Sequence, residues 1–169
     1  MKNFGQKIKN LTRYELFWAV THPFIASKSF AITQKAGQIA NEQRSNPQLD
    51  GDYNGGQVDA FRHVLWMAML VQEIKPKAAK KLGFAHEKAN YLYFKRHKNE
   101  DGSIPDSISS QMDLRNNEIG LELGQIYMGV SKDTIVQLVY RNIVEGKCWI
   151  IKKNELGDFL DNENNIIRQ

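Results

Sequence analysis

Three stretches of this sequence place ligand-type side chains four residues apart. The pairs are Asp59 with His63, His86 with Asn90, and Asp113 with Asn117. Residues at this spacing lie one turn apart on the same face of an α-helix. Carboxylates and imidazoles that converge between helices either hold a divalent metal ion that activates water, or move protons without a metal. The sequence therefore predicts a site shared by three helices and leaves both chemistries open.

Four of these residues are the candidates for catalysis, and equally for ligating one divalent ion: Asp59, His63, His86 and Asp113. Asp59 and His63 continue an apolar stripe, and a carboxylate or imidazole buried there needs a partner. Around the helical wheel, His86 lies opposite the lysines of its helix and points inward. The alternatives are an Asp59–Arg62 or Asp59–His63 bridge within one helix, and a hydrogen-bonded core histidine at position 86.

The predicted elements that position these residues are almost all helical. Apolar periodicity, caps and turn residues predict helices over residues 14–21, 27–43, 57–73, 76–98, 109–128 and 131–145, with polar loops at 45–56 and 99–108. Thr12 and Glu15 have the spacing of a capping box before the first helix. A short strand is predicted within 148–153. The fold expected is an all-α, compact, single-domain bundle of about six helices over residues 1–169.

Glycines on the helix that carries Asp113 predict how closely it packs. Gly120 and Gly124 share a face with Asp113 and Asn117, and mid-helix glycine costs about 1 kcal/mol relative to alanine. Two glycines on one stripe therefore indicate that another backbone approaches there. That approach would bring Asp113 and Asn117 near the first two helices. The alternative for Asn116 and Asn117 is a place near the helix N-terminus, which suits such residues.

Composition and charge exclude several classes of protein. The chain has 169 residues, 41% hydrophobic, with one cysteine, Cys148, and a net charge of +4. One cysteine excludes an internal disulfide framework and a multi-cysteine metal site. We expect no membrane-spanning segment and no signal peptide, and hence a cytoplasmic location in the producing cell. Residues 50–55 copy the start of an EF-hand loop, but Phe61 stands where a bidentate Glu is required, which rejects that motif.

The motif residues resemble those of an uncharacterised bacterial domain family. The resemblance covers about residues 54–124, with the pattern D-A-F-R-H-x-x-W, then A-H-E, then M-D-x-x-N-N-x-x-G; this chain departs from the family at Arg115, where a His is frequent. If that His is a ligand, its loss weakens the metal interpretation. Members often form the C-terminal module of secreted or polymorphic-toxin proteins. The resemblance thus implies an antibacterial effector, exported by a specialised secretion system, with a delivery or immunity protein as partner.

With the motif positions included, the residues expected to bind substrate are Arg62, Glu87, Asn90, Asn116 and Asn117. Arg62 can bind a phosphate or carboxylate with two parallel hydrogen bonds. Aromatic residues on the basic helix at 76–98 suit an anionic interface, and they are Phe84, Tyr91, Tyr93 and Phe94.

The leading hypothesis is a hydrolase that acts on phosphate-containing or cell-envelope material: phospholipid, lipid-linked precursor or peptidoglycan. The alternative is a non-enzymatic interaction module whose polar cluster specifies helix packing. The sequence carries no recognisable nucleic-acid motif and 19 acidic residues, which argues against nucleic-acid binding.

Overall fold

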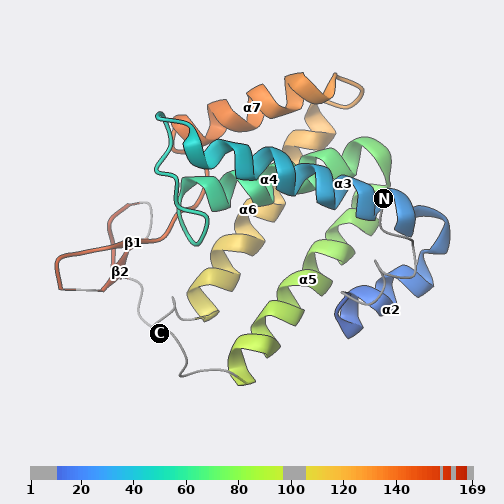
Figure 1. The fold of residues 1–169 in the computed structure, drawn as a ribbon, viewed down its shortest axis with the longest axis horizontal. Helices are drawn as coiled ribbons and strands as arrows, with labels where there is room; N and C mark the ends of the chain where they lie inside the picture. Colours follow the sequence, from blue (N-terminus) through green and yellow to red (C-terminus); the bar gives the residue numbers. More distant parts are fainter. Residues whose placement is uncertain (1–10, 97–105, 157, 161–162, 167–169) are drawn as a thin grey trace.

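The computed structural model describes residues 11–96, 106–156, 158–160 and 163–166 (Figure 1). In this part of the chain the helices are α2 (Arg13–Thr21), α3 (Pro23–Glu42), α4 (Gln57–Glu73), α5 (Pro76–Arg96), α6 (Asp106–Ile126) and α7 (Lys132–Val144), with a 3₁₀ turn at Gln43–Ser45. Two short antiparallel strands, β1 (Lys152–Lys153) and β2 (Phe159–Leu160), follow. The prediction of an all-α bundle of about six helices with a short C-terminal β segment is confirmed. None of the described helices is both long and apolar enough to span a bilayer.

Helix α4 is the centre of the bundle. Every residue from Val58 to Val71 is buried except Arg62, because this segment is apolar on nearly all sides. The helices that cover it are α3, α5, α6 and α7, and Figure 1 shows them arranged around it. Polar side chains on α4 are therefore enclosed by protein, and their hydrogen-bond partners must come from the surrounding helices.

The close approach predicted from the glycine stripe is confirmed at the α4–α6 contact. A Cβ atom at Gly120 would lie 2.4 Å from the carbonyl oxygen of Val64, and one at Gly124 would lie 2.8 Å from that of Ala68. Only glycine permits these contacts. They set α6 directly against α4, one to two turns from Asp113 and Asn117.

Two helices begin earlier than the sequence predicts. Helix α3 starts at Pro23 rather than at residue 27, since proline is tolerated in the first turn of a helix. Helix α6 starts at Asp106 rather than at residue 109, so the end of the predicted loop at 99–108 is helical. Residues 97–105 of that loop and of the preceding helix lie outside the described residues. The capping box of Thr12 and Glu15 is confirmed at the start of α2.

The α4–α6 contact predicts a difference between two glycine-to-alanine substitutions. Gly120→Ala forces a methyl group into the backbone of α4 and should lower the free energy of unfolding by about 1–3 kcal/mol. Gly37→Ala on α3 is the control, because a Cβ there meets nothing within 4 Å, and it should be neutral or stabilising by up to about 1 kcal/mol. Urea denaturation measures both. Equal effects of the two substitutions would contradict the packing described.

Candidate functional site

Three of the four predicted ligands meet at the α4–α6 contact. Atoms of Asp59, His63 and Asp113 that can ligate a metal lie within 4.8 Å of one another, and all three residues are buried. The Nε2 atom of His63 lies 3.1 Å from Oδ1 of Asp113 and 3.6 Å from Oδ1 of Asp59. Asp59 and His63 are one turn apart on α4, and the glycine contacts of α6 bring Asp113 to them.

The other ring nitrogen of His63 is oriented by α5 and α6. Its Nδ1 atom lies 3.3 Å from Oδ1 of Asn117 and 3.6 Å from Oε1 of Glu87. The amide nitrogen of Asn117 donates to Glu87 at 3.2 Å, so the amide oxygen faces the imidazole and accepts from Nδ1–H. This tautomer, inferred from the hydrogen bonds, directs the Nε2 lone pair at the two aspartates.

The arrangement leaves two buried atoms unsatisfied. Among the described residues, Nε2 of His63 and Oδ1 of Asp113 have no hydrogen-bond partner, although they lie close to each other. A lone pair and a carboxylate oxygen repel each other unless a proton or a cation lies between them. The gap between these atoms is therefore a place for a positive charge.

The protonation states of the three groups follow from burial. Burial lowers the pKa of His63 well below its usual value, and the charges of Arg62 and His86 lower it further, so the imidazole is neutral at pH 7. Burial raises the pKa of Asp113 to about 9, and the carboxylates of Glu87 and Asp59 add to the shift. Burial also raises the pKa of Glu87. Without a cation, Asp113 holds a proton at neutral pH.

Asp59 is held by its own helix and by the loop before it. Arg62 donates to Oδ1 of Asp59 through Nη2 at 2.5 Å and through Nε at 3.1 Å. The backbone N–H of Gly55 donates to Oδ2 at 2.8 Å. The intrahelical Asp59–Arg62 bridge that the sequence allowed is present, and it fixes the carboxylate rather than excluding it from the site.

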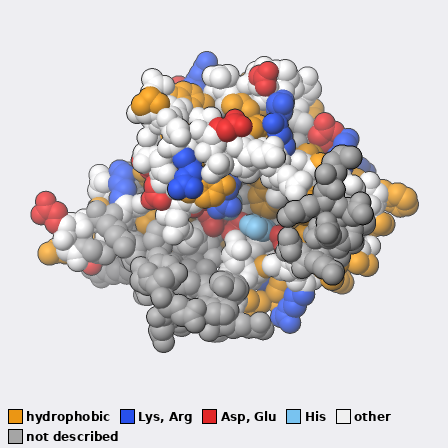
Figure 2. Space-filling model, in the orientation of Figure 1, with side chains coloured by type: hydrophobic (Ala, Val, Ile, Leu, Met, Phe, Trp, Pro, Cys, Tyr) orange, Lys and Arg blue, Asp and Glu red, His pale blue; other side chains and the backbone are white. Residues whose placement is uncertain are grey.

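The centre is buried, and Arg62 at its edge is partly exposed. The exposed fraction of the side chain falls from 29% for Arg62 to 8% for Asp113 and 1% for His63. Figure 2 shows one histidine side chain at the surface between α5 and α6, with acidic and basic side chains beside it. The guanidinium of Arg62 lies 5.2 Å from the centre of the Tyr53 ring, and that of Arg44 lies 5.7 Å from the same ring. Both guanidinium groups thus pack against Tyr53, and Arg62 also binds the carboxylate of Asp59.

His86, the fourth predicted ligand, lies apart from this group. Its Nδ1 atom lies 2.8 Å from Oε1 of Glu15 on α2, and its ring packs edge-on against Trp66. Adjacent residues on a helix point about 100° apart, so His86 and Glu87 cannot both face His63. Glu87 faces it, and His86 packs against Trp66, one turn further along α4. The residue that sequence reasoning missed is Glu15, because its capping-box role already accounted for it.

Two of the predicted substrate-binding residues are placed away from the centre. Asn90 is exposed, and its amide lies 3.5 Å from the carboxylate of Glu87. Asn116 is fully buried, but it donates to the backbone oxygen of Trp149 at 2.8 Å and accepts from the backbone nitrogen at 2.9 Å. Asn116 therefore ties the C-terminal segment to α6.

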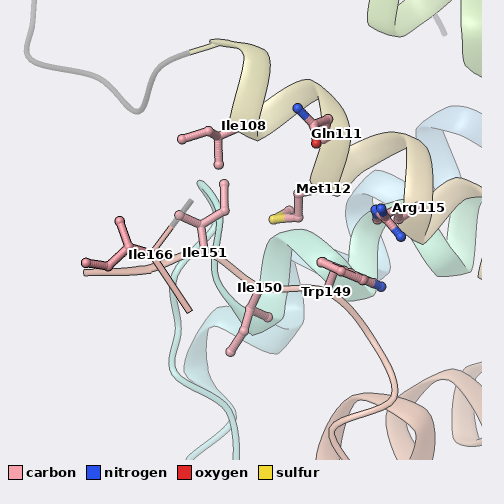
Figure 3. Close-up of a pocket in the computed structure, with 8 residues that line it drawn as sticks. All are labelled: Ile108, Gln111, Met112, Arg115, Trp149, Ile150, Ile151 and Ile166. Atoms are coloured by element: carbon pink, nitrogen blue, oxygen red, sulfur yellow. The ribbon is translucent and has the colours of Figure 1, made fainter. Parts of the chain in front are cut away.

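A separate pocket of about 240 Å³ lies on another face of α6 (Figure 3). It is lined by Ile108, Gln111, Met112, Arg115, Trp149, Ile150, Ile151 and Ile166. Arg115, where the resembled family often has a His, lies 4.1 Å from the centre of the Trp149 ring. Arg115 is thus outside the Asp–His–Asp group, which is complete without a ligand at that position.

The remaining candidates occupy structural positions. Asp50 and Asp52 accept from backbone N–H groups of their own loop, as in a closed turn. His22 stacks on Trp18 between α2 and α3. Cys148 is buried, and burial raises the pKa of its thiol to about 12.

Comparison with known proteins places the chain in a family without assigning an activity. The family model described as a domain of unknown function, DUF6973, matches residues 16–147. The chain belongs to this family. No curated protein and no solved structure matches it. Membership of an uncharacterised domain family is confirmed, whereas the motif pattern and the toxin context stay predictions.

The raised pKa of Asp113 predicts how metal-free protein responds to pH. The pKa of its carboxyl is 3.8 in the unfolded chain and about 9 in the folded one. The contribution of this group to the free energy of unfolding is therefore fully present below pH 3.8 and is lost as the pH rises toward about 9. Asp113→Asn removes this loss and should stabilise the protein by about 1–3 kcal/mol at pH 8. Thermal melts in EDTA from pH 5 to 9 measure the difference.

Glu118→Gln is the matched control, because Glu118 is an exposed carboxylate on the same helix. It should change stability by less than about 0.5 kcal/mol at every pH. If the Tm of wild type and of Asp113→Asn changed in parallel with pH, the prediction would be contradicted, because the carboxyl of Asp113 would then be ionised and hydrogen-bonded in the folded protein.

Proposed function

We propose that this protein is a metal-dependent hydrolase whose centre is formed by Asp59, His63 and Asp113. One observation carries the proposal: the buried Nε2 of His63 faces two carboxylate oxygens at 3.1 and 3.6 Å with no hydrogen bond to compensate. Ligand atoms at about 2.0–2.2 Å from one ion lie about 3.0–3.5 Å from each other. Nε2 of His63 and Oδ1 of Asp113 have this spacing, and Oδ1 of Asp59 would reach it with a small movement.

The donor set favours a particular kind of ion. One imidazole and two carboxylates suit Zn²⁺, Mn²⁺ or Fe²⁺, and three protein ligands leave positions for water and substrate. Such an ion lowers the pKa of its bound water and polarises the scissile bond. Asn117 and Glu87, on the other nitrogen of His63, have the outer-shell role of fixing the ring.

The surroundings of the centre support an anionic substrate. Arg62 lies at its partly exposed edge and packs on the Tyr53 ring, as Arg44 does, and guanidinium groups recognise phosphate and carboxylate. On the Asn117 side, a hollow of about 290 Å³ between α5 and α6 combines apolar side chains with Arg115 and the Lys80–Glu118 ion pair. We therefore propose phosphate-containing or cell-envelope substrates: phospholipid, lipid-linked precursor or peptidoglycan. Phe84 and Tyr91 are exposed on basic α5, which supports peripheral contact with anionic lipid; the side chains of Tyr93 and Phe94 lie outside the described residues.

The competing function is a non-enzymatic interaction module. It is favoured by the raised pKa of Asp113, because a proton on that carboxyl, which hydrogen-bonds to Glu87, removes one negative charge from the cluster without any metal. The polar residues would then form a closed network that specifies how α4, α5 and α6 pack. Affinity for metal separates the two functions.

Metal binding should release a proton and strengthen with pH. Calorimetry of EDTA-treated, dialysed protein with Zn²⁺ or Mn²⁺ should show one ion per chain. The ion displaces the Asp113 proton, so the affinity should rise about tenfold per unit between pH 6 and 8, with about one proton released. His63→Ala and Asp113→Asn should each weaken binding by more than about 100-fold, and Glu118→Gln should not. Binding that none of these variants alters would exclude the centre as the metal site.

Hydrolysis is tested on a phosphodiester chromogen, phospholipid vesicles and isolated peptidoglycan. The metal-loaded protein should cleave at least one of them, and EDTA should abolish the reaction. Asp113→Asn, a variant expected to fold well, should reduce kcat/KM by more than about 100-fold. An antibacterial effector further predicts that wild type but not Asp113→Asn inhibits growth when directed to the bacterial periplasm. Equal growth with both variants would exclude the effector role.

A further inference from the structure

A second titratable pair lies beside the proposed centre, between α2 and α5. Oε1 of Glu15 lies 2.8 Å from Nδ1 of His86, across 71 residues of sequence. The other carboxylate oxygen accepts from the backbone N–H of Thr12 at 2.9 Å and from its hydroxyl at 2.8 Å. Both oxygens of Glu15 are thus engaged, and the carboxylate is fixed in place.

The imidazole of His86 is held in one orientation. Its ring lies 5.2 Å from the indole of Trp66 at an interplanar angle of 68°, and that indole is itself anchored by a hydrogen bond to Thr33. Glu15 occupies Nδ1, and no described residue hydrogen-bonds to Nε2. The side chain of His86 is 27% exposed. Nε2 is therefore the nitrogen available to a molecule from solution.

His86 lies beside the centre. It precedes Glu87, which faces His63, on α5, and its ring packs against Trp66, one turn along α4 from His63. Its charge contributes to the lowered pKa of His63. The charged or titratable groups around His86 are therefore Glu15 from α2, Glu87 on its own helix, and His63 from α4.

We infer that Glu15 and His86 form the proton-transfer dyad of the proposed hydrolase; the inference rests on the proposed function. Nδ1–H of His86 donates to Glu15, which makes Glu15 a positioning residue. Nε2 takes a proton from the attacking water as its oxygen bonds to the electrophilic atom of the ester. When the ester bond breaks, Nε2–H gives that proton to the leaving oxygen. Water is added across the bond, and nothing is oxidised or reduced.

A carboxylate on Nδ1 is the arrangement that makes a histidine an effective base, because it fixes the tautomer and stabilises the imidazolium. The pKa of Glu15 agrees with such a role: burial acts to raise it, but the hydrogen bonds from His86 and Thr12 bring it below its usual value. A capping box alone needs neither His86 nor a buried carboxylate. Helix capping does not account for the contact between Glu15 and His86, whereas a role in proton transfer does.

The test compares Glu15→Gln and His86→Ala with wild type in the Mn²⁺-loaded protein, using bis(p-nitrophenyl) phosphate. Gln keeps the capping box, so Glu15→Gln should fold normally. It should lower kcat by about tenfold or more and alter the acidic limb of the pH–rate profile, because the carboxylate that fixes the tautomer of His86 is lost. His86→Ala should lower kcat by about 100-fold or more and abolish that limb. Calorimetric Mn²⁺ affinity should stay within about twofold in both variants.

Trp18→Phe is the control for a merely structural clamp. The indole N–H of Trp18 donates to the backbone oxygen of Ala78, which also joins α2 to α5. Its removal should lower the Tm and leave the pH–rate profile unchanged. ¹⁵N NMR of His86, which needs no turnover, should show a proton on Nδ1 in wild type and a change of tautomer in Glu15→Gln, because the carboxylate that accepts from Nδ1–H is lost.

The outcomes separate the two proposals. Unchanged kcat and pH profile in Glu15→Gln and His86→Ala, with Mn²⁺ binding intact, would overturn the dyad and leave the hydrolase standing. A profile that Trp18→Phe shifts as much as Glu15→Gln does would reduce the dyad to a clamp between helices. Failure of wild type to bind Mn²⁺ would overturn the metal centre itself, and the dyad with it.

Discussion

The imidazole of His63 is buried, and its Nε2 lone pair points at two carboxylates. The surrounding residues must offset the electrostatic repulsion between these groups. Burial keeps the ring neutral, and the same burial holds the pKa of Asp113 at about 9. A buried group in this condition needs a proton or a cation beside it. Asn117 and Glu87 act on the opposite nitrogen, so they fix the direction of the lone pair without relieving it. The centre is therefore built to receive positive charge.

The bundle creates this condition through ordinary packing. Helix α4 is apolar enough to be enclosed on all sides, and two glycines on α6 let the backbones meet. Any carboxylate at position 113 is then pressed against position 63. Arg62 is the one residue of α4 between Val58 and Val71 that is not buried, and it links the centre to solvent and to the arginine–tyrosine group at the rim. Structure and chemistry thus depend on the same helix contact.

The sequence predicted the parts of this arrangement that follow from local periodicity. The helices and the capping box of α2 come from spacings within one helix, and the glycine stripe indicated that α6 brings Asp113 to Asp59 and His63. The sequence placed His86 among the ligands and Glu87 among the substrate-binding residues, whereas Glu87 is the one that faces His63. Neighbours on a helix differ by about 100°, so a small rotation of the helix exchanges the two. The Glu15–His86 pair and the hold of Asn116 on Trp149 join residues 71 and 33 positions apart. No local pattern specifies such partners, and only the packing of whole helices reveals them.

The most direct measurement is a crystal structure of the protein soaked with Mn²⁺ or Zn²⁺, with diffraction data collected at the absorption edge of the metal. A metal centre predicts one anomalous peak about 2.0–2.2 Å from Nε2 of His63 and within bonding distance of carboxylate oxygens of Asp59 and Asp113. The absence of an anomalous peak beside His63 at millimolar metal and pH 8, with Nε2 and Oδ1 of Asp113 still at hydrogen-bonding distance, would contradict a metal centre and leave a structural network in its place.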